Sequence, residues 1–94
     1  MHSKTLRRTE LLALLDMDEE LLGLLEREEI ICVTPGDCYS EEDAEAARLA
    51  RTLVKDLDVN LPGVEVILEM RKNMIEMQRQ FRQILEELSQ RMRC

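Results

Sequence analysis

Apolar residues in the first part of the chain recur in two short blocks with helical spacing. The leucines of residues 9–15 form one block and those of residues 21–25 form the other. In each block the leucines fall on one side of a helix, which is the pattern of a surface helix packed on a core. Asp16 and Met17 separate the blocks. The pattern predicts two short helices joined by a tight turn, a helix-turn-helix unit.

Capping residues support both helices. Thr9 stands at the expected start of the first helix and Asp18 at the start of the second. Side chains of these types accept hydrogen bonds from the free N–H groups of a first turn. Glu19 and Glu20 follow Asp18, where the helix dipole favours negative charge. We expect residues 3–7, ahead of the first helix, to form a short strand or an extended arm.

The middle of the chain predicts a small hairpin followed by a third helix. Residues 30–33 form a short apolar run, and the Pro35-Gly36 pair after it suits the centre of a type II turn. Residues 38–39 would return as the second strand. Ser40 then caps a helix that ends near residue 58. Its apolar positions, at helical spacing, are Ala44, Ala47, Ala50, Val54 and Leu57.

The last part of the chain predicts one long helix with a coiled-coil seam. Asn60 serves as its cap, and Pro62 falls in the first turn, where the missing N–H costs nothing. A helix of about 31 residues is about 46 Å long, so its distal half outreaches so small a globule. We expect the seam to pair with the same seam of a second copy, giving a homodimer. The seam residues are Ile67, Met70, Met74, Met77, Phe81, Ile84 and Leu88.

Composition fits this reading. The chain has 94 residues, of which 45% are apolar but only 2% aromatic. A core made of Leu, Ile, Val and Met is typical of packed helices, so the predicted fold class is mainly α. Residues 1–58 would hold the helix-turn-helix, a small wing and the third helix, and residues 59–94 the long helix, within one structural domain.

Charge is spread unevenly along the chain. Residues 9–46 hold thirteen carboxylates and a single base, Arg27, for a local charge of −12. Such a surface repels nucleic-acid phosphate and anionic lipid, so a basic protein surface is the expected partner. The same acids also stabilise helix N-termini and keep a protein soluble, which is the structural alternative. The candidate partner-binding residues are Asp16, Asp18, Glu19, Glu20, Glu26 and Glu28.

The sequence offers little for other kinds of chemistry. No apolar run approaches the roughly 18 residues that span a bilayer, and no signal-peptide core is evident, so we expect a cytoplasmic protein without a membrane role. Cys32, Cys38 and Cys94 are expected to be thiols. With His2 as the single histidine, no metal site or cofactor is expected. Neither a catalytic triad nor a phosphate-binding loop is present, which indicates a protein that is not an enzyme.

Two segments carry a family resemblance. Residues 39–43 (YSEED) look like the segment after the wing of the MerR superfamily, and the order of predicted elements resembles that superfamily over essentially the whole chain. Residues 60–68 (NLPGVEVIL) are similar to the start of the last helix in its heat-shock repressor (HspR) branch and in the CbpM family of chaperone modulators. The resemblance implies a winged helix-turn-helix with a long dimerisation helix, paired antiparallel.

The recognition helix separates the two branches. DNA-binding members carry a motif like TLRYYER, and when Glu26 is aligned with its glutamate, Leu21, Gly23, Leu24 and Leu25 replace its threonine, arginine and two tyrosines. The groups that contact DNA are missing. The resemblance therefore favours a CbpM-like modulator that binds the J-domain of a DnaJ- or CbpA-type co-chaperone and inhibits it. The alternative is an HspR-like transcriptional regulator. The sequence leaves open a residual DNA contact through Lys4, Arg7, Arg8 and the mildly basic last helix.

Overall fold

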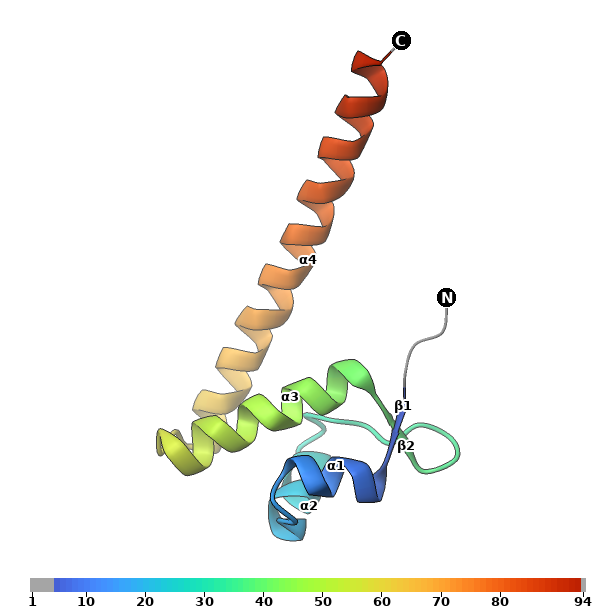
Figure 1. Cartoon of the computed structure of the whole chain (residues 1–94). Helices are drawn as coiled ribbons and strands as arrows, with labels where there is room; N and C mark the ends of the chain where they lie inside the picture. The colour runs from blue at the N-terminus through green and yellow to red at the C-terminus, as the bar shows by residue number, and fades with distance from the viewer. Residues whose placement is uncertain (1–4, 94) are drawn as a thin grey trace. The chain divides into compact units, whose positions relative to one another are not determined.

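The computed structural model describes residues 5–93 and is mainly helical, as predicted (Figure 1). Lys4, Cys94 and His2 lie outside the described residues. The chain divides into an N-terminal unit that ends at Val64 and a C-terminal unit that begins at Glu65. The elements in order are β1 (Thr5–Arg7), α1 (Arg8–Leu14), α2 (Glu19–Arg27), β2 (Cys38–Ser40), α3 (Glu41–Arg51), the π-helical segment η1 (Thr52–Asp56) and α4 (Leu61–Met92).

The first strand leads directly into the first helix. Arg7 ends β1 and is also the N-cap of α1, with extended backbone angles of φ −78 and ψ 160. Its N–H donates to the Glu10 carboxylate at 3.1 Å. The prediction that Thr9 caps this helix is wrong, because the strand brings the helix start forward and leaves Thr9 inside the first turn.

A tight turn connects α1 to α2. Asp16 and Met17 both adopt left-handed backbone angles, with φ of 55 and 59. The Met17 N–H donates to the Leu12 carbonyl at 2.7 Å, which closes the end of α1. Asp18 is the N-cap of α2, as predicted, and accepts a hydrogen bond from the Leu21 N–H at 2.9 Å. The two helices predicted from the leucine blocks are therefore present.

The small two-stranded antiparallel element is confirmed, but one of its strands differs from the prediction. β2 pairs with β1, with Tyr39 opposite Leu6, and residues 30–33 form no strand. Ile31 is instead buried in the core, and the Cys32 N–H donates to the Asp43 carboxylate at 3.0 Å. A side chain of α3 thus takes the place of a strand partner. The turn before β2 has Gly36 at φ 91, the conformation for which glycine is suited.

The third helix packs through small residues. Ser40 caps α3, accepting from the Asp43 N–H at 3.1 Å. Ala44, Ala47 and Ala50 are buried, as their spacing predicted. Leu57 was expected on the same face, but it is 64% exposed because the helical segment η1 ends at Asp56.

The core of the N-terminal unit is aliphatic with one buried tyrosine. It draws on α1, α2, β2, α3 and the first turn of α4. Asn60 caps α4, as predicted, because its side-chain oxygen accepts from the Gly63 N–H at 2.9 Å. The largest fully buried side chains are Tyr39, Leu11, Leu15, Leu22, Leu25, Ile31 and Val64.

Candidate protein-binding surface

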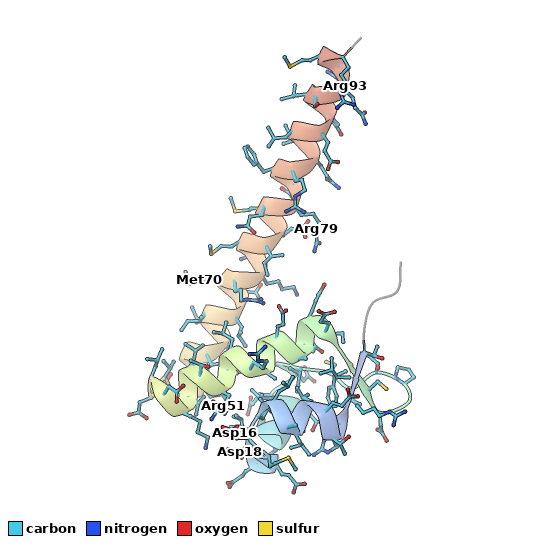
Figure 2. The ribbon with its side chains drawn as sticks, viewed as in Figure 1. Asp16, Asp18, Arg51, Met70, Arg79 and Arg93 are labelled. Atoms are coloured by element: carbon cyan, nitrogen blue, oxygen red, sulfur yellow. The ribbon has the colours of Figure 1, made fainter. Side chains whose placement is uncertain are left out.

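Two of the six candidate acids are ion-paired at the turn between α1 and α2. Asp16 pairs with Arg51, from the end of α3, and Asp18 pairs with Lys55 of η1 at 3.0 Å. Figure 2 shows Asp16 and Asp18 beside Arg51. The bases are four residues apart, so each can reach one of the acids that flank Met17. The turn is therefore tied to the far end of α3 and η1.

Asp18 performs two structural tasks with one carboxylate. Its Oδ1 accepts from the Leu21 N–H, and its Oδ2 faces the Lys55 ammonium. The hydrogen bond from Leu21 is the main cause that lowers the pKa of Asp18, and the bond to Lys55 adds to it. Both partners favour the charged form. Only 23% of the Asp18 side chain is exposed, so it is less available to a partner than its neighbours.

Glu26 belongs to a different cluster. Its two oxygens accept from the Arg8 guanidinium and from the Tyr39 hydroxyl, each at 2.9 Å, and Arg8 also donates to that hydroxyl at 3.1 Å. The pKa of Tyr39 is raised, first because the ring is buried and second because of Glu26, while Arg8 opposes the shift. The hydrogen bonds that Arg8 donates, first to Glu26 and then to Tyr39, raise the pKa of Arg8. Glu26 therefore serves to satisfy a buried phenol.

The remaining candidate acids are exposed, but they do not form one group. Glu19 and Glu20 lie at the start of α2, directly after the ion-paired connection between α1 and α2. Glu28 is the C-cap of the same helix. A nine-residue helix is about 13 Å long, so Glu28 lies well away from the turn. The structure thus brings together four acids: Asp16, Asp18, Glu19 and Glu20.

Two apolar side chains at this turn were not recognised in the sequence. Leu14 is 40% exposed and Met17 is 64% exposed. Leu14 was expected to face inward with the other leucines of its block, but α1 ends there and the left-handed turn begins two residues later. Leu21 and Leu25 are buried in the core, so they are not available to a partner. We call Leu14, Met17 and the four acids the turn surface.

The second candidate surface is the predicted seam of α4. Ile67 is partly exposed, whereas Met77 and Phe81 are 67% and 62% exposed (Met70 is labelled in Figure 2). Three exposed residues outside the predicted seam, Val66, Leu85 and Met92, lie on the same side by helical spacing. At 100° per residue, these residues and the seam fall within an arc of about 100°. We call this set of side chains the apolar stripe.

Three further properties of residues 5–93 bear on function: metal binding, the thiols and membrane crossing. In this part of the chain no three His, Cys, Asp or Glu side chains are grouped so that they could hold a metal ion. Cys32 and Cys38 are free thiols. None of the helices there combines the length and the apolar character needed to cross a membrane.

Comparison of the chain with protein families, with curated proteins and with solved structures gave no match. The resemblance to the MerR superfamily therefore rests on the sequence alone, through the order of the predicted elements and two specific segments. Residues 39–43 run from the end of β2 into the first turn of α3. Residues 60–68 comprise the cap and the first turns of α4.

Proposed function

We propose that this protein is a non-enzymatic chaperone modulator that binds the J-domain of a DnaJ-type co-chaperone and inhibits it. The observation that carries the proposal is the turn surface, where the exposed apolar side chains of Leu14 and Met17 are followed along the chain by the exposed carboxylates of Glu19 and Glu20. The J-domain is the binding partner of the CbpM family, which the sequence resembles. J-domains present a basic helix to an acidic Hsp70 surface. An acidic surface with an apolar centre would compete for that helix, because opposite charges steer the encounter and apolar contacts supply affinity.

The charge of α2 argues against a DNA-binding regulator. Glu19 and Glu20 are exposed on this helix, and Glu28 is exposed at its C-cap. Gly23 has no side chain at the position where the DNA-binding regulators that the sequence resembles carry arginine. Carboxylates near a phosphate backbone weaken binding, since most DNA affinity comes from cations that displace counterions. Tight, strongly salt-dependent binding to a DNA operator would instead indicate a DNA-binding repressor.

We further infer that the protein acts as a homodimer through α4. The apolar stripe spans residues 66–92, which is about 40 Å of helix at 1.5 Å per residue. Much of it would remain in contact with water in a single chain. An apolar stripe of this length with a three-four spacing is covered most simply by a second copy of itself. Antiparallel pairing follows the resemblance.

The test of J-domain binding uses two matched charge reversals. Glu19→Lys with Glu20→Lys changes the turn surface, and Glu41→Lys with Glu42→Lys makes the same change in the first turn of α3. Both pairs are exposed first-turn acids, so helix-dipole losses are similar. By surface plasmon resonance with a purified J-domain, we expect about tenfold slower association and a weaker salt dependence for the α2 pair alone.

The outcomes separate three possibilities. Failure of the wild-type protein to bind several J-domains at micromolar concentration would reject the proposed function. Slower association of the α3 variant alone would move the interface to Glu41 and Glu42. Binding of an operator DNA by the wild-type protein, with loss at moderate salt, would support the alternative of a transcriptional regulator.

A further inference from the structure

Backbone hydrogen bonds define the conformation of the turn at Met17. Met17 donates its N–H to the Leu12 carbonyl at 2.7 Å, and Asp18 donates to the Leu15 carbonyl at 3.2 Å. The residues on either side of Met17 are each held by an ion pair, Asp16 with Arg51 and Asp18 with Lys55. Because these contacts constrain the backbone around Met17, binding of a partner at this turn costs little backbone conformational entropy.

The exposed side chains at this turn combine two properties. Met17 is 64% exposed and Leu14, three residues earlier, is 40% exposed, although neighbouring leucines are fully buried. Along the chain, the ion-paired acids Asp16 and Asp18 flank Met17, and the exposed acids Glu19 and Glu20 follow. An apolar centre within a charged rim is the usual anatomy of a protein-binding hot spot.

The charge pattern selects one type of partner. A second copy of the same surface would bring the exposed acids Glu19 and Glu20 against their own counterparts, and an anionic membrane would be repelled in the same way. A basic amphipathic helix matches both properties, because it offers an apolar row flanked by Lys or Arg. The flexible, unbranched side chain of methionine can adapt to the spacing of such a row.

We propose that Met17, with Leu14, is the apolar anchor on which a basic amphipathic helix of the partner docks, while Glu19 and Glu20 meet the cations of that helix. This inference rests on the proposed function. It assigns the association rate and the dissociation rate of the complex to different residues. The acids set the rate of association, whereas the anchor sets the rate of dissociation. The expected target is the basic helix of the J-domain.

The test replaces the anchor without disturbing the turn. Met17→Asn removes the apolar side chain and introduces a residue that tolerates the left-handed conformation found at this position. Leu57→Ala is the matched control, because Leu57 is also 64% exposed in the same unit. With a purified J-domain in surface plasmon resonance, we expect Met17→Asn to speed dissociation about tenfold or more and to change association less than about twofold. Leu57→Ala should match the wild-type protein.

Each result decides a separate point. If the wild-type protein binds the J-domain and Met17→Asn dissociates at the same rate, the role of Met17 as the anchor is rejected but the proposed function stands. Equal loss in Leu57→Ala also overturns it, since any exposed apolar residue would then serve. No binding by the wild-type protein rejects the proposed function and the anchor with it. Circular dichroism verifies folding, and Leu14→Gln, which retains a good helix former, tests the same anchor if Met17→Asn fails to fold.

Discussion

The N-terminal unit and the distal part of α4 use apolar residues in opposite ways. Leu11, Leu15 and Leu22 are fully buried within the chain, whereas Met77 and Phe81 are more than 60% exposed. In the N-terminal unit the helices are short and separated by turns, so their apolar faces converge on one core. α4 continues without a break to Met92. Helical periodicity therefore identifies an apolar face but does not say which molecule covers it.

The largest effect that can test this contrast is expected in the core. Leu22→Ala should lower the free energy of unfolding by about 2–5 kcal/mol, because it leaves a cavity where a fully buried side chain was. Leu88→Ala, on a residue that is 50% exposed, should cost less than about 1 kcal/mol in dilute protein. Urea unfolding measures both. Equal losses at low protein concentration would mean that the stripe is covered within one chain.

The next effect concerns the apolar stripe itself. Phe81→Glu with Ile84→Glu should convert the expected dimer to a monomer, since two charges would enter a buried seam. Gln83→Glu with Gln90→Glu adds the same charge on the opposite side of α4 by helical spacing and should leave the dimer intact. Light scattering at tens of micromolar distinguishes the two. A monomeric wild-type protein at that concentration would disprove the pairing.

The parts of the fold that follow local rules could be predicted from the sequence. Asp18, Ser40 and Asn60 were recognised as caps because a cap depends on residues two or three positions away. The pairing of Leu6 with Tyr39 could not be found in this way, because its strands lie more than thirty residues apart. The apolar run of residues 30–33 was therefore assigned to a strand, although the N–H of Cys32 in this run donates to the Asp43 carboxylate.

The candidate site was predictable in charge but not in geometry. Counting acids located the region, but only the structure shows that Asp18 is clamped and that Glu26 bonds to a buried tyrosine. Ion pairs to Arg51 and Lys55 depend on where α3 ends, which no local pattern reveals. Leu14 carried a helical spacing typical of a core residue, and its exposure results from the early end of α1.

The smallest predicted effect is on the pH dependence of stability, and it concerns Asp18 of the turn surface. The pKa of Asp18 is lowered in the folded state, from a usual value of 3.8, by the Leu21 N–H and by Lys55. The unfolded chain therefore takes up this proton first as the pH falls. The stabilisation by Asp18 is complete above pH 4 or so, and it is lost as the pH falls through the folded-state pKa.

Asp18→Asn isolates that contribution because asparagine is also a good N-cap but carries no charge. We expect the variant to be about 0.5–1 kcal/mol less stable than the wild-type protein at pH 7, mainly through the loss of charge at the helix N-terminus and of the bond to Lys55. The difference should shrink as the pH falls below about 4 and vanish once Asp18 is protonated. Urea titrations from pH 7 to pH 3 measure it. A constant difference over that range would mean that the carboxylate acts at this turn through its shape and not through its charge.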